Sequence, residues 1–234
     1  MNSADGCVLC ITDISKTYKT EKLSVPVLFD IDLKINKGEF VSIMGPSGCG
    51  KSTLMNLIGC LDRPSGGSIV LNGNNIASLS DSKLAEIRNR YVGFVFQTFN
   101  LLPRVTAVEN VEIPLIYSGV ERKERRKKAL EALDSMGVLS RAEHKPNEIS
   151  GGEKQRVAVA RAIVNSPSII LADEPTGNLD SKSGKEVMNI FKSLNESGVT
   201  ILMVTHDPGI AAYGSRMVKL FDGKVVEDSE IKKS

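Results

Sequence analysis

Three short apolar runs stand out along the chain, and each is nearly continuous rather than alternating. They are EFVSIMG (residues 39–45), PSIILADE (167–174) and VTILMVTHD (199–207). A continuous run of this length is typical of a strand buried on both faces, as in a parallel sheet. Segments with helical spacing, KSTLMNLIGCL and SGKEVMNIFKSLNES, follow the first and second runs. This alternation predicts an α/β fold with a mostly parallel sheet.

Two other regions have different patterns. Near the N-terminus, CVLCITDI, VLFDIDLKINKGE and GSIVLNG predict short antiparallel strands joined by turns. From about residue 80 to residue 150 the pattern is mostly helical and rich in charge. We expect a helical insertion at about residues 98–150, within a single domain that spans residues 1–234. Residues 122–128 hold six basic side chains in seven positions, which a solvated helix face explains; a patch for an acidic partner or a lipid surface is the alternative.

Composition and charge argue against a nucleic-acid-binding, a membrane-spanning or a secreted protein. The net charge of +2 gives no argument for binding nucleic acid or an anionic membrane. No apolar run reaches the roughly 18–20 residues that span a bilayer. The N-terminal residues lack the basic start and apolar stretch of a signal peptide, so we expect a cytoplasmic protein.

The chain has four cysteines, of which Cys7 and Cys10 have the spacing of half a zinc site. No second Cys/His pair completes such a site, and a strand explains CVLC better. No disulfide is expected in the cytosol.

The stretch GPSGCGKST (residues 45–53) matches the phosphate-binding loop G-x-x-x-x-G-K-[ST], with a predicted strand before it and a helix after it. Its glycines let backbone N–H groups face the β-phosphate of a nucleoside triphosphate. Lys51 brings a positive charge to the β- and γ-phosphate oxygens, and the Ser52 hydroxyl can ligate Mg²⁺. The loop predicts a nucleoside-triphosphate site.

Polar side chains follow the other predicted strands where each ends. Asp173 can hold Mg²⁺, and Glu174 can orient and deprotonate the attacking water. His206 ends the third apolar run and Gln97 ends YVGFVFQ. Because ligands of open α/β sheets gather at the carboxyl ends of strands, His206 is expected near the γ-phosphate and Gln97 near the metal or water.

Taken together, these residues resemble the ATP-binding subunits of ABC transporters over essentially the whole chain. GPSGCGKST resembles the Walker A motif, IILADE Walker B, Gln97 the Q-loop, ISGGEKQ the ABC signature, GNLD the D-loop and His206 the switch histidine. LIGCLDRPSGG, FVFQTFNLLP and ADEPTGNLDS are similar to the lipoprotein-release and macrolide-export branch.

The resemblance implies an ATPase that uses ATP and Mg²⁺ and drives export through separate integral membrane permease subunits, on the inner face of the cell membrane. Two copies would pack head to tail, so that each signature turn binds the γ-phosphate held by the other copy. A contact present only before hydrolysis supplies the differential binding that a conformational switch requires. A membrane scaffold of the cell-division type is the alternative. ABC ATPases that act on nucleic acid usually carry long coiled-coil insertions or tandem ATPase domains. The middle segment here is short and has no sustained heptads, so no nucleic-acid partner is expected.

The expected site is therefore the following set. Catalysis involves Lys51, Glu174 and His206; ATP binding involves Tyr18 (stacked on adenine), Gly45, Pro46, Ser47, Gly48, Cys49, Gly50, Lys51, Ser52 and Thr53; metal binding involves Ser52, Gln97 and Asp173; the trans ATP contact involves Ser150, Gly151 and Gly152; and the dimer contact involves Asp180.

Three positions depart from the usual family pattern. Ile149 replaces a leucine, which conserves volume. Glu153 and Lys154 stand where glutamines are frequent. A carboxylate in the first turn of a helix favours the helix dipole, but it also places negative charge near the partner's phosphates and is expected to weaken trans binding slightly.

The loop after the Q-loop glutamine is apolar. Phe99, Leu101, Leu102 and Pro103 suit a groove that receives a permease helix, and local packing under the insertion is the alternative.

Overall fold

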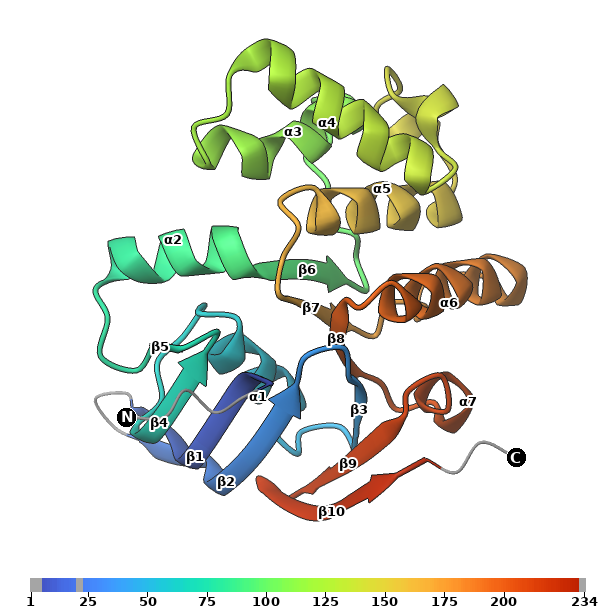
Figure 1. The fold of residues 1–234 in the computed structure, drawn as a ribbon. Coiled ribbons are helices and arrows are strands. Elements are labelled where there is room, and N and C mark those ends of the chain that lie inside the picture. Colours follow the sequence, from blue (N-terminus) through green and yellow to red (C-terminus); the bar gives the residue numbers. More distant parts are fainter. Residues whose placement is uncertain (1–5, 20–22, 232–234) are drawn as a thin grey trace.

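The computed structural model describes residues 6–19 and 23–231, and its first sheet is antiparallel. This sheet has the strand order β2-β1-β4-β5 (Figure 1). Its strands are β1 (Cys7–Lys19), β2 (Ser24–Asn36), β4 (Gly66–Leu71) and β5 (Asn74–Asn75). The predicted antiparallel N-terminal region is confirmed, because β1 pairs antiparallel with both β2 and β4.

The second sheet has six strands in the order β10-β9-β3-β8-β7-β6. They are β3 (Phe40–Met44), β6 (Val92–Phe96), β7 (Ile169–Asp173), β8 (Thr200–Val204), β9 (Arg216–Phe221) and β10 (Lys224–Glu230). The pairs β3–β8, β8–β7, β7–β6 and β3–β9 are parallel, and only the β9–β10 pair of this sheet is antiparallel. The three apolar runs are β3, β7 and β8, so the predicted parallel sheet is confirmed.

Helices cover both faces of the six-stranded sheet (Figure 1). They are α1 (Lys51–Ile58), α2 (Asp81–Tyr91), α3 (Ala107–Tyr117), α4 (Arg122–Ser135), α5 (Gly151–Ile163), α6 (Ser181–Glu196) and α7 (Pro208–Ala211), with 3-10 turns η1 (Leu139–Arg141) and η2 (Pro146–Glu148). The residues of 98–150, where the insertion was expected, hold α3, α4, η1 and η2. Helix α5 packs against α3, α4, α6 and β6.

Strand β7 separates two hydrophobic cores, because its successive side chains alternate between the faces of the sheet. Ile169 and Leu171 pack in the core that contains α1 and the antiparallel sheet. Ile170 and Ala172 pack in the core that contains α3, α4, α5 and α6. Strand β8 alternates in the same way, so α1 and α5 lie on opposite faces of the sheet.

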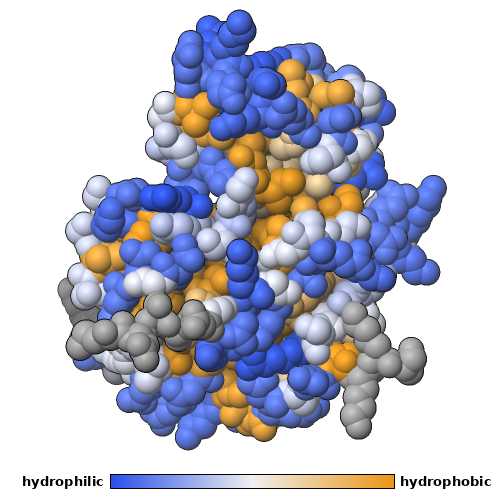
Figure 2. Space-filling model, viewed as in Figure 1, coloured by the Kyte–Doolittle hydropathy of each residue, from blue (hydrophilic) through white to orange (hydrophobic). Residues whose placement is uncertain are grey.

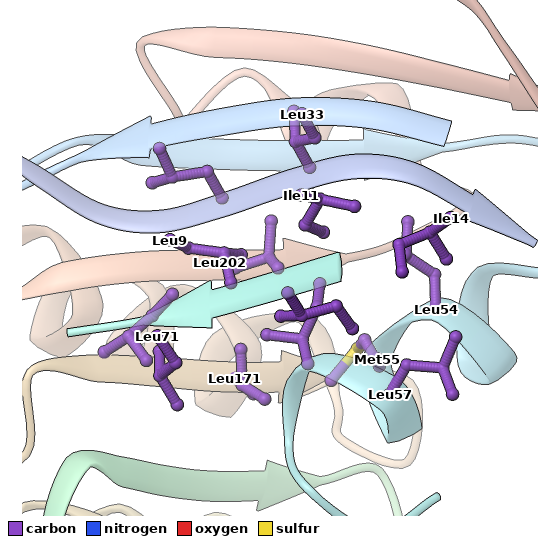
Figure 3. Close-up of a cluster of buried hydrophobic side chains, with 14 of the residues drawn as sticks. Leu9, Ile11, Ile14, Leu33, Leu54, Met55, Leu57, Leu71, Leu171 and Leu202 are labelled. Carbon is purple, nitrogen blue, oxygen red and sulfur yellow. The ribbon is translucent and has the colours of Figure 1, made fainter. Parts of the chain in front are cut away.

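The first core lies between the two sheets and around α1 (Figure 3). Leu9, Leu54, Leu57, Leu171 and Leu202 are fully buried there. Each such side chain contributes roughly 1.5–3 kcal/mol relative to an exposed one. This packing fixes α1 against the sheet and thereby places the loop before it.

Helix α4 carries the basic run of residues 122–128, and most of its charges are paired. Arg125 and Arg126 both contact the carboxylate of Glu112, and Arg126 also pairs with Glu143. Lys127 and Lys128 pair with glutamates one turn away on the same helix. These pairs favour a solvated helix face over a patch for a partner.

Cys7 and Cys10 form a disulfide, contrary to the expectation from sequence. In a regular strand, side chains three residues apart point to opposite faces. The pairing of β1 with β2 shifts register between Cys7 and Leu9. This irregularity lets the two side chains meet, with their Cα atoms 6.6 Å apart, within the range that a disulfide spans.

Candidate functional site

The phosphate-binding loop joins β3 to α1 and requires glycine at defined points. A Cβ atom on Gly45 would lie 2.1 Å from the carbonyl oxygen of Leu220. Gly50, which precedes α1, has φ of 102°, a conformation that residues with a Cβ atom rarely adopt. The loop therefore passes close to β9 and turns sharply into the helix, which is the geometry that exposes backbone N–H groups.

Lys51 begins α1, and its side chain lies over this loop. Its ammonium donates to the carbonyl oxygens of Gly45 at 2.8 Å and Pro46 at 2.7 Å. The sulfur of Cys49 lies 3.8 Å from the same nitrogen. Cys49 is buried, whereas Pro46, Ser47, Gly48 and Ser52 are exposed to solvent. The positive charge is thus held where phosphates would contact the loop.

Glu174 and His206 are in direct contact at the carboxyl ends of β7 and β8. Their Oε1 and Nδ1 atoms are 2.7 Å apart, and the backbone N–H of His206 donates to the same Oε1 at 3.0 Å. The other carboxylate oxygen accepts from the hydroxyl of Thr205 at 3.3 Å. Glu174 has a φ of 46°, so the chain leaves the extended conformation at this residue. The two expected catalytic side chains form one pair beside Asp173.

Electrostatics distinguish the ionisable groups of this site. Burial raises the pKa of Asp173, the charge of Glu174 raises it further, and the nearby Lys51 ammonium opposes both. The hydrogen bond to Glu174 and the charge of that carboxylate raise the pKa of His206 above its usual 6.5. The charges of Glu174 and Lys51 therefore act on both Asp173 and His206 at the strand ends.

Gln97 follows β6 and contacts the turn after Glu174. Its Nε2 donates to Oδ1 of Asn178 at 3.4 Å, and Asn178 donates back to the carbonyl oxygen of Gln97 at 3.0 Å. Asp180 caps α6, where its carboxylate accepts from the N–H groups of Lys182 and Ser183. The Q-loop and D-loop segments are thus joined in the structure, and the side chain of Gln97 is turned toward Asn178.

Tyr18 lies at the end of β1, with its side chain 40% exposed. Its hydroxyl donates to Asp62 at 3.0 Å, and the ammonium of Lys16 lies 4.7 Å from the ring centroid. Lys16 in turn forms an ion pair with Asp62. These contacts fix the ring while leaving much of it accessible to solvent.

The signature turn begins α5 and is built as a capping box. Ser150 Oγ accepts from the N–H of Glu153 at 3.3 Å, and the Glu153 carboxylate accepts from the N–H of Ser150 at 2.8 Å. A Cβ atom on Gly152 would lie 2.9 Å from the hydroxyl oxygen of Ser183 on α6, so a larger residue would require Ser183 to shift. Because α1 and α5 lie on opposite faces of the sheet, the two glycine-rich turns begin helices of different layers.

The structure also shows two residues that the sequence reasoning missed. The buried Gln155 on α5 donates to the carbonyl oxygens of Pro175 at 2.5 Å and Phe96 at 3.3 Å. Arg161 donates to the carbonyl oxygens of Asn100 and Phe99 at 2.6 and 3.0 Å. Helix α5 therefore holds the segment around Gln97 at both ends. The sequence did hold a signal for Gln155, because this polar residue shares one helix face with the apolar Val159 and Ala162.

Comparisons with known proteins agree with this geometry. The family model described as ABC transporter matches residues 28–177. An uncharacterized ABC transporter ATP-binding protein of Bacillus subtilis, YvrO, is 54% identical over 94% of this chain and 96% of its own length. The macrolide export ATP-binding/permease protein MacB of Marinobacter nauticus is 50% identical over 94% of this chain, which spans only 34% of that protein.

A solved structure is similar over nearly the whole chain. It is the ATP-binding cassette MJ0796, a protein of Methanocaldococcus jannaschii, as a dimer in a post-hydrolysis state bound to ADP and Pi. The TM-score is 0.88 at 47% sequence identity, covering 97% of this chain and 100% of that one. The matched loop, strand-end carboxylates and signature turn all lie in the aligned region, and the chain belongs to the ABC transporter family of ATP-binding proteins.

Proposed function

We propose that this chain binds ATP, hydrolyses it with Mg²⁺, and powers transport through separate membrane subunits. The observation that carries the proposal is the placement of two phosphate-binding turns on opposite faces of one sheet. The loop at residues 45–53 lies beside the catalytic pair Glu174 and His206, whereas the turn of Ser150, Gly151 and Gly152 begins the helix on the other face. A second copy brings its own turn to the first copy's nucleotide.

Nucleotide binding follows from the loop geometry. The N–H groups of residues 45–53 surround the phosphates, with Lys51 contributing charge. Tyr18 stacks on the adenine with the ring face that Lys16 leaves open. The Lys16 ammonium on the other face and the hydrogen bond to Asp62 orient the ring for this contact.

The donor atoms in the site fit Mg²⁺. Asp173, Ser52 and Gln97 offer carboxylate, hydroxyl and amide oxygens, and Mg²⁺ prefers oxygen ligands. No cluster of three or more His, Cys, Asp or Glu occurs in the described part of the chain, which fits an ion held by one carboxylate together with phosphates. Bound there, Mg²⁺ neutralises charge on the β- and γ-phosphate oxygens. Gln97 must turn away from Asn178 to join it.

Hydrolysis relies on the pair at the strand ends. Glu174 accepts the proton of the attacking water, and His206 contacts both that carboxylate and the γ-phosphate. The Glu174 carboxylate raises the pKa of His206, which favours the protonated imidazole and thus a hydrogen bond from the ring to the phosphate. Lys51 stabilises the charge that develops on the transferred group.

Dimerisation completes each site. The N–H groups at the start of α5 and the hydroxyl of Ser150 bind the partner's γ-phosphate. Asp180, which caps α6, contributes to the contact between the two copies. MJ0796 is described as dimeric, which supports the same assembly here. Loss of the γ-phosphate removes the trans contact and opens the dimer.

A cavity on the helical side suits the membrane partner. It has a volume of about 990 Å³ and lies between α2, β6, α3 and α5, with Phe94, Phe96, Ile113, Tyr117 and Arg161 among its lining residues. Figure 2 shows apolar surface gathered between the upper helices and the sheet. In the apolar loop after Gln97, Leu102 is 52% exposed, whereas Leu101 packs against the core, so only part of this loop is available for docking.

The permease is a separate chain in this proposal. Within residues 6–19 and 23–231, no helix is long and apolar enough to cross a membrane. MacB is described as an ATP-binding/permease protein, which joins both functions in one chain. We place this subunit in the cytoplasm, on the inner face of the membrane, in an export system. No observation specifically favours the cell-division scaffold.

The test is sedimentation of Glu174→Gln with Mg-ATP, with Mg-ADP, and with ATP plus EDTA. Removing the base should trap ATP, so we expect a dimer in Mg-ATP and a monomer in the other two conditions. A monomer under all three conditions would contradict the dimer mechanism. Co-purification with a permease rather than with a cell-wall-remodelling protein distinguishes transport from the scaffold alternative.

A further inference from the structure

Glu153 is the charged residue of the signature turn, and both of its carboxylate oxygens are engaged. Oε2 accepts from the N–H of Ser150 at 2.8 Å. Oε1 accepts from Nε of Arg141 at 2.7 Å. Arg141 ends η1, on the segment that leads into α5. The Glu153 side chain is 18% exposed and the Arg141 side chain 42% exposed, so the pair lies at the surface edge of the turn.

The carboxylate of Glu153 is ionised under physiological conditions. The hydrogen bond from Arg141 and that from the Ser150 backbone lower its pKa to about 2. A full negative charge therefore lies within one helical turn of the residues proposed to bind a triphosphate. An unpaired carboxylate that close to a phosphate at a protein surface would repel it enough to weaken binding on the order of tenfold or more.

The same carboxylate also orders the turn. By accepting from the Ser150 N–H it fixes the backbone of the cap, and Ser150 Oγ accepts from the Glu153 N–H in return. Because Ser150 Oγ accepts a hydrogen bond inside the turn, its hydroxyl hydrogen is left free to be donated to a phosphate oxygen. The Glu153 carboxylate thus helps to position Ser150, but its negative charge disfavours the approach of a phosphate.

We infer that Arg141 compensates the charge of Glu153, so that this carboxylate can position Ser150 without repelling the partner's ATP. Arg141 is then a positioning residue for the trans nucleotide site rather than a catalytic residue. The inference rests on the proposed function, because it requires that the signature turn meets a nucleotide held by a second copy.

The test uses the full chain with Glu174→Gln as the parent and measures the ATP concentration for half-maximal dimerisation by sedimentation. Arg141→Ala should raise this concentration about tenfold or more, because Glu153 is left uncompensated. Arg141→Lys, which keeps the charge, should raise it by less. Glu153→Gln should stay within about threefold of the parent, because a glutamine also serves at this position of a capping box.

The deciding variant is Arg141→Ala combined with Glu153→Gln. Removing the carboxylate should restore dimerisation to within about threefold of the parent, and added salt should partly rescue Arg141→Ala alone through screening. Binding of ATP to the monomer, followed with a fluorescent analogue, should be the same in every variant, since the chain's own phosphate loop is untouched.

Two results overturn the inference in distinguishable ways. If the parent dimerises and Arg141→Ala behaves like it, or if the double variant is as weak as Arg141→Ala, Arg141 does not act through the charge of Glu153. If the parent itself remains monomeric in Mg-ATP, the proposed dimer mechanism fails together with this inference.

Discussion

Gln155 offers a sharp test of how the signature helix is held, because the chain contains a matched control. Replacing Gln155 by Met keeps the side-chain length but removes the donor to the carbonyl oxygens of Pro175 and Phe96. The Phe96 oxygen retains the N–H of Phe99 at 3.2 Å as a partner. The main loss is therefore the hydrogen bond to Pro175, whose oxygen stays buried.

The magnitude follows from two opposing terms. Leaving a buried acceptor without its donor costs about 1–3 kcal/mol. The substitution also removes Oε1 of Gln155, which is buried without a hydrogen-bond partner, and this relief offsets about 1 kcal/mol. We expect a net loss of roughly 0–2 kcal/mol in the free energy of unfolding, centred near 1 kcal/mol, which corresponds to about 2–4 °C in melting temperature for a chain of this size.

The control is Gln97→Met, the same substitution at an exposed glutamine whose amide makes a single side-chain contact of 3.4 Å. It should change the free energy of unfolding by less than about 0.5 kcal/mol. Urea and thermal unfolding of both variants provide the comparison. Equal stability of the two variants would refute the idea that Gln155 stabilises the junction of α5 with the strand ends.

Two further predictions concern the nucleotide site. Because Glu174 raises the pKa of His206, the charged pair stabilises the fold below pH 6.5, and that stabilisation is lost as pH rises through the pKa of the folded state. NMR titration of His206 should give a midpoint above 6.5 that falls toward 6.5 in Glu174→Gln. A wild-type midpoint at or below 6.5 would contradict the contact. Cys49 is 4% exposed and lies beside Lys51, so its alkylation should be slow, prevented by ATP and accompanied by loss of ATP hydrolysis. Cys49→Ser should resist this inactivation and is the control. Burial raises the pKa of the other free thiol, Cys60, to about 11 and disfavours its reaction. Normal hydrolysis by fully alkylated protein would count against that placement.

The parts of the fold that sequence predicts are those governed by local pattern. The runs containing Val41, Leu171 and Leu202 are apolar at consecutive positions because both faces of each strand are covered, and this alone indicated a buried parallel sheet. The polar residues that follow the runs were then expected at one edge. The contact of Glu174 with His206 agrees with that expectation.

The remainder depends on contacts between distant segments, which no local pattern specifies. Tyr18 was assigned by resemblance, but its pairing with Asp62 joins residues 44 positions apart. The disulfide of Cys7 and Cys10 depends on an irregular register that CVLC does not reveal. Arg141 had no signal at all, because an arginine in a surface turn is ordinary until its partner is known.

The left-handed backbone of Glu174 has a consequence for engineering the chain. A residue with a side chain in this conformation costs on the order of 1 kcal/mol or more, and glycine would adopt it with little strain. Glycine would relieve this strain but would also remove the proposed base and its hydrogen bonds to Thr205 and His206, so a library selected only for heat tolerance places no value on the carboxylate's role in hydrolysis. Experiments that stabilise the subunit should keep Glu174 unchanged, because backbone stability favours glycine at this position whereas ATP hydrolysis requires the carboxylate.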